Sequence, residues 1–265
     1  MTLTEAIEQL LQGTALNREQ ARTVMDQVMA GEATSAQIAG LLIALRARGE
    51  TVEEMTGFVE SMRAHATPLE VPPGSIDTCG TGGDRAGTFN ISTAAALVAA
   101  GAGIPVAKHG NRAASSRCGS ADVLEDLGHE RALVFYGEDG LDELTTTGPS
   151  RVFQLRNGKI DDFELDPKDL GLGRARAEEL KGGTPAENAA LLRQVLNGDT
   201  GPRRDVVLLN AAAAILAAGR AEDWPQAMDV ARESLDSGRA AQVLSRLIET
   251  SRTPSPSGGG QGGGA

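Results

Sequence analysis

The chain changes character at three closely spaced prolines, Pro68, Pro72 and Pro73. Before them, residues 2–67 place apolar side chains at helical spacing and carry several helix-start sequences. After Ser75, short apolar segments alternate with glycine-rich loops and helix-forming stretches. Proline cannot continue a helix, and alternating strand and helix signals are typical of α/β architecture with parallel strands. The sequence therefore predicts a helical unit followed by an α/β unit.

Each expected helix of the first unit has its own start signal. A Thr or Asn followed three residues later by Glu or Gln can pair reciprocally with the first amides of a helix. Such capping boxes start at four residues, Thr2, Asn17, Thr34 and Thr51. Residues 37–48 also carry Ile and Leu at a spacing that gives one apolar helix face. We expect a helical packing module, whose surplus apolar surface could also serve a dimer interface.

The second unit is expected to mix strands and helices. Strands are predicted at 75–78, 104–107 and 131–136, and a hairpin at 151–155 and 160–165 that turns at Asn157-Gly158. Helices are predicted at 92–100, 121–127, 184–198, 205–219 and 225–250. Residues 210–218 are almost all small and apolar, which predicts burial. We therefore divide the chain into a helical domain at 1–70, an α/β domain at 71–251 and a disordered, Gly-rich tail at 252–265.

The charge of the chain argues against one class of partner. The formal net charge is −11, so the chain lacks the positively charged surface that is typical of a nucleic-acid-binding protein. A phosphorylated small ligand is compatible with it, because a local basic cluster or a helix N-terminus can bind phosphate. The two cysteines, Cys79 and Cys118, indicate no disulfide framework. No basic leader precedes an apolar run, and no apolar stretch reaches the roughly 18 residues of a membrane span, so we expect a cytoplasmic protein without a membrane partner.

A glycine-rich segment, Asp77–Asp84, follows the first expected strand. Its glycines let the backbone turn sharply, and its successive amides can form a nest for an anion. It lacks the Gly-Lys-Ser/Thr of a Walker A loop, and Arg85 stands where a dinucleotide-binding motif has its third glycine. A plain tight turn is the alternative interpretation. In the segment Asn90–Thr93, Ser92 or Thr93 is predicted to cap the next helix, whose N-terminus then faces whatever the loop holds.

Two further segments carry charges suited to a diphosphate and a metal ion. Lys108–Ser120 combines three basic side chains with serine hydroxyls, which suits a di- or polyphosphate. Asp142 and Glu143 follow the expected strand at 131–136. Adjacent carboxylates after a strand suit Mg²⁺, which takes oxygen ligands and keeps phosphates of the bound ligand in its shell. Solvated surface positions are the alternative interpretation of both segments.

Taken together, these segments resemble the anthranilate phosphoribosyltransferase family. The resemblance rests on four stretches, Asp77–Asp84, Asn90–Thr93, Lys108–Leu127 and Gly137–Glu143. It implies a small helical domain beside a larger α/β domain of the nucleoside phosphorylase/phosphoribosyltransferase type, usually as a homodimer. The implied reaction, a step of tryptophan biosynthesis, joins anthranilate to 5-phospho-α-D-ribose 1-diphosphate. Its products are N-(5-phosphoribosyl)anthranilate and diphosphate.

The resemblance also implies roles for individual residues. Phosphoribosyl diphosphate would be held by Gly80, Gly83, Asp84, Thr88, Asn90, Ile91, Ser92, Thr93, Lys108, His109, Gly110, Asn111, Arg112, Ala113, Ala114, Ser115, Ser116 and Ser120. Anthranilate would contact Gly80 and Asn111, and Mg²⁺ would be served by Ser92, Asp142 and Glu143. No protein nucleophile is required, because the aromatic amine attacks directly once the substrates are positioned and the charge on the leaving diphosphate is neutralised.

The chain departs from the family's pattern at one place. Family members continue after the segment 121–127 with several tens of residues that are absent here, including an arginine that pairs with the anthranilate carboxylate. Instead, Gly128 runs directly into His129. We hypothesise an internal deletion after Gly128, between two copies of Leu-Gly, which would remove strands of the sheet and part of the acceptor site. The competing interpretation is a catalytically inactive relic that only binds phosphoribosyl diphosphate and Mg²⁺.

Overall fold

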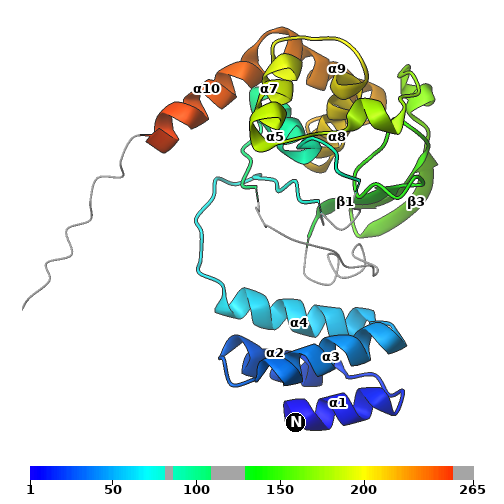
Figure 1. Cartoon of the computed structure of the whole chain (residues 1–265), viewed down its shortest axis with the longest axis vertical. Helices are drawn as coiled ribbons and strands as arrows, with labels where there is room; N and C mark the ends of the chain where they lie inside the picture. The colour runs from blue at the N-terminus through cyan, green and yellow to red at the C-terminus, as the bar shows by residue number, and fades with distance from the viewer. Residues whose placement is uncertain (81–85, 109–128, 253–265) are drawn as a thin grey trace, which may run out of the picture.

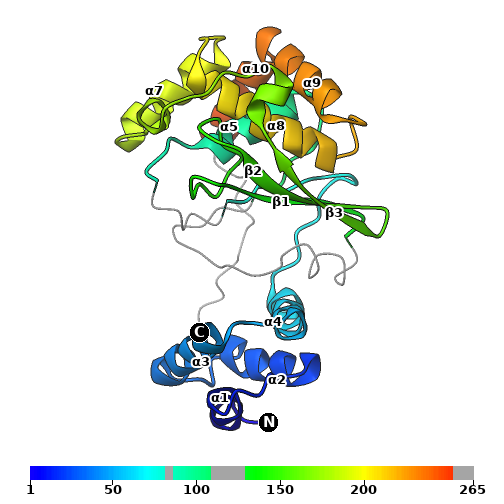
Figure 2. The ribbon, with the colours of Figure 1, turned by 90° about the vertical axis from the view of Figure 1, so that its right-hand side faces the viewer.

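The computed structural model describes residues 1–80, 86–108 and 129–252. These residues form two bodies, one of four N-terminal helices and one that combines a small sheet with a layer of helices (Figure 1). The sheet lies on the side of the α/β body that is turned toward the helical body, and the helices cover its opposite face (Figure 2). The predicted order of a helical unit followed by an α/β unit is confirmed. The helix predicted at 121–127 lies outside the described residues, as does the tail from residue 253.

The helical body consists of α1 (Leu3–Leu11), α2 (Arg18–Met29), α3 (Ser35–Arg48) and α4 (Val52–His65). All four predicted capping boxes form, because the Thr or Asn before each helix accepts a hydrogen bond from the amide three residues on. The helices close on an apolar core of their own, with Leu10, Leu16 and Leu41 almost fully buried. Helices α2 and α4 approach closely, since a Cβ added to Gly57 would lie 2.2 Å from Arg18 O.

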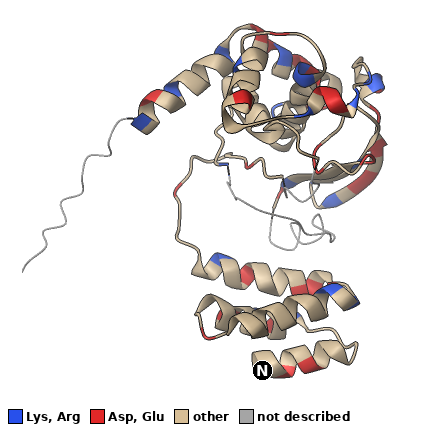
Figure 3. Cartoon of the chain, viewed as in Figure 1, with Lys and Arg blue, Asp and Glu red and all other residues tan. Residues whose placement is uncertain are grey.

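The α/β body begins with α5 (Ile91–Gly101) and continues through β1 (Arg131–Gly137), β2 (Ser150–Arg156), β3 (Lys159–Leu165), η1 (Pro167–Leu170), η2 (Ala177–Leu180), α7 (Pro185–Leu196), α8 (Pro202–Ala217), α9 (Trp224–Asp236) and α10 (Arg239–Arg252). The predicted hairpin is confirmed as β2 and β3. Asn157 and Gly158 take φ angles of 54° and 69°, the left-handed backbone that a two-residue hairpin turn requires. The exposed side chains of β3 include Asp161, Asp162 and Glu164, an acidic stripe in Figure 3 that discourages pairing with another chain at this edge.

The three strands of the sheet pair in the order β1-β2-β3 and run antiparallel, so the parallel pairing predicted for the α/β domain does not extend to them. The expected strands at 75–78 and 104–107 pair in parallel only through Ile76 and Val106. Ile76 N donates to Pro105 O at 3.0 Å and Ala107 N to Ile76 O at 2.9 Å. Pro105 has no N–H with which to extend the ladder, and the two-residue turn between β2 and β3 permits only antiparallel pairing.

The core of the α/β body combines Leu, Val and Ile side chains with many alanines. The predicted burial of 210–218 is confirmed from Asn210 to Leu216. Gly101 at the end of α5 packs so closely that an added Cβ would lie 2.6 Å from Ala240 N. The single helix predicted at 225–250 is wrong, because Gly238 takes a φ of 75° and separates α9 from α10. Within the described ranges, no helix is long and apolar enough to cross a membrane.

Candidate active site

Three of the predicted site segments come together around Thr78, which belongs to the glycine-rich segment. The parallel contact between Ile76 and Val106 carries Lys108 to the glycine-rich segment, where Lys108 Nζ donates to Thr78 O at 2.6 Å. On its other side, the Thr78 hydroxyl donates across 3.4 Å to Ser92 O in the first turn of α5. A short backbone segment thus connects a cation and a helix N-terminus, the two kinds of group that bind phosphate.

The acidic pair faces this segment. A Cβ added to Gly80 would lie 3.2 Å from Glu143 Oε1 and 3.6 Å from Asp142 Oδ2. Loss of water around its sulfur raises the pKa of the neighbouring Cys79 thiol, and the Asp77 carboxylate raises it further, against the opposing effect of Lys108. Gly80 is the residue type that lets a backbone pass this close to two carboxylates.

The acidic pair stands on a firmly tied turn after β1. Leu141 N donates to Asp139 Oδ1 at 3.2 Å, and Gly137 N donates to Leu141 O at 2.8 Å. Thr145 Oγ1 donates to Asp139 Oδ2 at 2.8 Å, so one carboxylate links both ends of the turn. A Cβ added to Gly137 would crowd both Asp139 Oδ1 and the Thr145 side chain, which lies 2.9 Å away and is hydrogen-bonded to the same carboxylate. The turn therefore presents Asp142 and Glu143 from a fixed backbone.

The start of α5 differs from the prediction. The helix is capped at Asn90, not at Ser92 or Thr93, and the Asn90 side chain makes no capping hydrogen bond. Asn90 has φ −69° and ψ 72°, and Ile91 N donates to Phe89 O at 2.7 Å, which is the geometry of an inverse γ-turn. This turn starts the helix two residues early, so Ser92 and Thr93 lie within its first turn.

A segment that the sequence analysis did not select holds the approach to α5. Phe89 N donates to Leu180 O at 3.2 Å, and Gly182 N donates to Gly87 O at 3.0 Å. Thr88 therefore pairs with Lys181 as an isolated antiparallel bridge. Another residue missed by the sequence analysis is Asn210, the polar residue within the buried run of α8, and its isolation among apolar neighbours was the signal that could have revealed it.

Many predicted phosphate-binding residues lie outside the described part of the chain, namely Gly83, Asp84, His109, Gly110, Asn111, Arg112, Ala113, Ala114, Ser115, Ser116 and Ser120. Among the described residues, Gly80, Lys108 and Ser92 gather with Asp142 and Glu143 through the contacts above. Thr88, Asn90, Ile91 and Thr93 precede or begin the same helix.

The donor set suits Mg²⁺ in one specific way. Within the described ranges, no three His, Cys, Asp or Glu side chains gather in a group that could hold a metal ion. Mg²⁺ is commonly bound by one or two carboxylates together with water and ligand phosphates, so it needs no such group. Asp142 and Glu143 beside Gly80 therefore fit a Mg²⁺ ion that a bound diphosphate shares.

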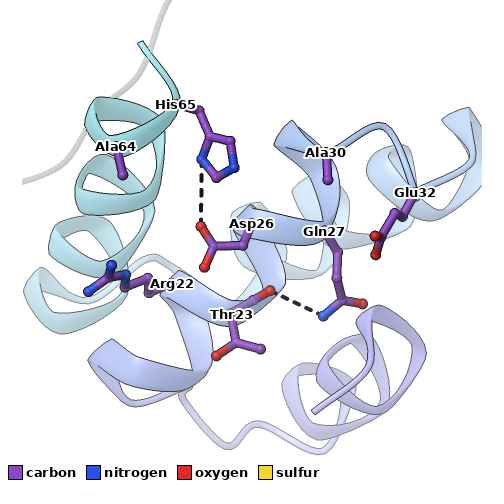
Figure 4. Close-up of a pocket in the computed structure, with 8 residues that line it drawn as sticks. All are labelled: Arg22, Thr23, Asp26, Gln27, Ala30, Glu32, Ala64 and His65. Atoms are coloured by element: carbon purple, nitrogen blue, oxygen red, sulfur yellow. Dashed lines mark hydrogen bonds and ion pairs between the residues drawn. The ribbon is translucent and has the colours of Figure 1, made fainter.

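A hollow of about 520 Å³ lies elsewhere, in the helical body (Figure 4). Its lining residues come from α2, from the end of α4 and from the turn after α2. His65 Nδ1 lies 3.7 Å from Asp26 Oδ1 there, and Gln27 Nε2 donates to Thr23 O at 3.1 Å. None of the predicted site residues lines this hollow, so the convergence around Gly80 is the better candidate.

Both parts of the chain match domains of a glycosyl transferase family. Residues 4–66 match the helical bundle domain of a glycosyl transferase family, and residues 73–130 and 123–241 match its a/b domain. Anthranilate phosphoribosyltransferase 2 of Ralstonia nicotianae is 39% identical over 333 residues, covering 94% of this chain and 97% of the relative. The enzyme of that name from Moorella thermoacetica is 41% identical, covering 91% and 96%. The chain belongs to the anthranilate phosphoribosyltransferase family.

Solved structures agree with this assignment. The crystal structure of anthranilate phosphoribosyltransferase from Thermus thermophilus matches with a TM-score of 0.82 and 36% identity, covering 94% of this chain and 99% of that one. The Saccharomyces cerevisiae enzyme in complex with PRPP and Mg matches with a TM-score of 0.77 at 20% identity, covering 94% and 97%. The second likeness concerns the fold alone.

The comparisons also locate a break inside the chain. The a/b domain matches in two pieces that both include residues 123–130. The match to the Ralstonia relative extends over 333 residues, more than the 265 residues of this chain. The relatives therefore contain an internal stretch that is missing here, as predicted after Gly128. The shared residues at the junction agree with a deletion between similar sequences.

Proposed function

We propose that the protein transfers the phosphoribosyl group of 5-phospho-α-D-ribose 1-diphosphate to anthranilate, in a step of tryptophan biosynthesis. The observation that carries the proposal is the meeting of Lys108, Gly80 and the pair Asp142 and Glu143 around one short backbone segment. A positive group lies on one side of this glycine-containing backbone segment, and a pair of possible metal ligands lies on the other. Together they can neutralise the charge of a diphosphate as it leaves. Relatives named anthranilate phosphoribosyltransferase support the choice of substrates.

In this proposal the protein positions the two substrates, which then react directly with each other. The amine nitrogen of anthranilate forms a bond to the anomeric carbon, the bond from that carbon to diphosphate breaks, and the amine loses a proton. Lys108 and the first turn of α5 bind phosphate oxygens, and Gly80 lets the ligand approach the backbone. Asp142, Glu143 and Ser92 would hold Mg²⁺, which neutralises charge on the leaving diphosphate when bound. Orienting two substrates supplies the remaining advantage.

The remaining assignments follow the same proposal. Residues 1–70 act as the helical domain, and 71–251 act as the α/β domain that binds phosphoribosyl diphosphate, with 252–265 as a tail. Further contacts to that ligand come from Gly83, Asp84, Thr88, Asn90, Ile91, Thr93, 109–116 and Ser120, and Asn111 contacts anthranilate together with Gly80. We place the protein in the cytoplasm as a homodimer. The exposed apolar residues Leu42 and Ile43 of α3, 57% and 68% exposed, support a helical body that serves association.

The proposal is tested by following anthranilate fluorescence in a mixture of purified protein, phosphoribosyl diphosphate and Mg²⁺. We expect a Mg²⁺-dependent loss of fluorescence, with a relative from the same family assayed alongside. The double variant Asp142→Asn with Glu143→Gln should abolish this loss and also the Mg²⁺-dependent thermal stabilisation by phosphoribosyl diphosphate. A matched control, Asp229→Asn with Glu233→Gln, removes the same charge from the exposed side of α9 and should change neither.

The outcomes separate two functions, because the break within 123–130 favours a second candidate, a protein that binds phosphoribosyl diphosphate without transferring it. Thermal stabilisation by the ligand without loss of anthranilate would select that candidate. The absence of both signals, with the relative active, would reject both functions. Stabilisation that is equally dependent on Mg²⁺ in the double variant would reject Asp142 and Glu143 as the metal-binding pair.

A further inference from the structure

A buried amide in α8 reaches the backbone beside the acidic pair. Asn210 is 4% exposed and lies in a run, Val206–Leu216, whose other members are all apolar. Burying a carboxamide among such neighbours is unfavourable unless its hydrogen bonds are formed. Asn210 forms three, and two of them go to Leu144, the residue that directly follows Glu143.

The two bonds to Leu144 are complementary. Leu144 N donates to Asn210 Oδ1 at 3.0 Å, and Asn210 Nδ2 donates to Leu144 O at 2.8 Å. Asn210 Nδ2 also donates to Val206 O at 2.9 Å, one turn earlier in α8, which fixes the orientation of the amide. Both backbone polar groups of Leu144 are therefore paired with one side chain, and Leu144 itself is 0% exposed.

The acidic pair is held from both sides by this arrangement. Leu141, on its N-terminal side, is tied to Asp139 and Gly137, and Leu144, on its C-terminal side, is tied to Asn210. Both leucines are buried, whereas Asp142 and Glu143 between them are only partly buried. Two anchors this close leave the intervening backbone little freedom, so the carboxylates are directed toward Gly80.

We infer that Asn210 is a positioning residue that holds Asp142 and Glu143 in the geometry required to share a divalent cation with the bound diphosphate. This inference rests on the proposed function, since it assigns Asn210 a role in the same site. Asn210 touches neither substrate nor metal and acts through the backbone of Leu144. Residues that orient metal ligands in this way usually change metal affinity by about 10- to 100-fold when they are replaced.

The test measures the Mg²⁺ concentration that gives half of the thermal stabilisation by phosphoribosyl diphosphate. Asn210→Leu keeps the branch at Cγ but leaves both Leu144 groups unpaired, and it should raise this concentration about 10-fold or more. Ser234→Ala is the matched control, because Ser234 Oγ donates to Val98 O at 2.6 Å and is equally buried, away from the acidic pair. It should lower the melting temperature without changing the Mg²⁺ midpoint.

A purely structural role of Asn210 and a positioning role predict different results for Asn210→Leu. A melting-temperature loss with an unchanged Mg²⁺ midpoint in Asn210→Leu would overturn the inference while the proposed function stands. If Asn210→Leu does not fold, Asn210→Ala decides, because it removes the same hydrogen bonds to Leu144 without adding bulk and should raise the same midpoint. A parental protein without Mg²⁺-dependent stabilisation would remove the metal site itself, and the role of Asn210 with it.

Discussion

Replacing Glu54 by glutamine should weaken the helical body selectively. The Glu54 side chain is 0% exposed and accepts hydrogen bonds from Leu16 N at 2.8 Å, from Thr51 N at 2.9 Å and from the Arg48 guanidinium. Glutamine has the same shape, but its NH₂ group cannot accept and it leaves the Arg48 charge unpaired. Removing one partner of a buried ion pair costs about 3–5 kcal/mol. The lower end applies, because Arg48 keeps 16% of its side chain exposed.

The effect should depend on pH in a defined direction. Burial alone would raise the pKa of the Glu54 carboxyl, but the hydrogen bonds from Leu16, Thr51 and Arg48 outweigh it and lower that pKa. A lowered folded-state pKa means that the stabilisation is complete above the unfolded value of about 4.3. It is lost as the pH falls through the folded value. The parental helical body should therefore weaken in acid, and the difference from Glu54→Gln should shrink there.

Urea denaturation can assign the change to one body. The single Trp and the single Tyr, Trp224 and Tyr136, lie in α9 and β1, so their fluorescence reports the α/β body. Far-UV circular dichroism also reports the helical body. With a urea slope of about 1–3 kcal/mol per molar, Glu54→Gln should move the helical transition by about 1 M or more. The fluorescence transition should stay in place.

A control on the same helix sharpens the result. Glu60→Gln removes an ion pair with Arg18 whose side chains are 35% and 29% exposed. Such exposed pairs contribute about 0–1 kcal/mol. A Glu54→Gln loss no larger than that of Glu60→Gln would refute the reasoning, and so would an equal shift of the Trp224 fluorescence transition.

Two glycine substitutions extend these expectations. Gly182→Ala would place a Cβ 2.9 Å from Phe89 N, so it should shift the approach to α5 and raise several-fold the phosphoribosyl diphosphate concentration for half-maximal stabilisation. Gly148→Ala, where an added Cβ meets nothing within 4 Å, is its control, and equal behaviour of the two would contradict the assignment. Gly101→Ala would place a Cβ 2.6 Å from Ala240 N and should cost about 1–3 kcal/mol in the Trp224 fluorescence transition. An unchanged midpoint there would show that α5 and α10 can separate without cost.

Predictions from sequence succeeded where the determining contacts are local. The capping boxes and the Asn157-Gly158 turn depend on residues within a few positions of each other, and all of them formed. The predicted parallel pairing formed only between Ile76 and Val106, and the antiparallel pairing of β1 with β2 was not predicted, because strand pairing depends on partners that a local pattern does not identify. The cap of α5 failed because an inverse γ-turn at Asn90, held by the distant Leu180, starts the helix early.

The candidate site shows the same division. The glycine-rich segment and the acidic pair were identified from residue types, and the structure brings their described parts together. Asn210 was missed, because its contact with Leu144 joins residues 66 positions apart. Gly238 was missed as a helix end for a different reason, since apolar residues keep helical spacing on both of its sides.

The range of these contacts sets an order for biosynthesis. The hydrogen bonds that start α1 to α4 span three residues, so the helical body can fold as soon as it leaves the ribosome. The acidic turn waits for Asn210, and the end of α5 waits even longer for Ser234, 136 residues after Val98. During that interval Leu141 and Leu144 have no core to enter. Chaperone binding and early proteolysis should therefore concentrate on the nascent turn between β1 and β2, and cease once α8 has been synthesised.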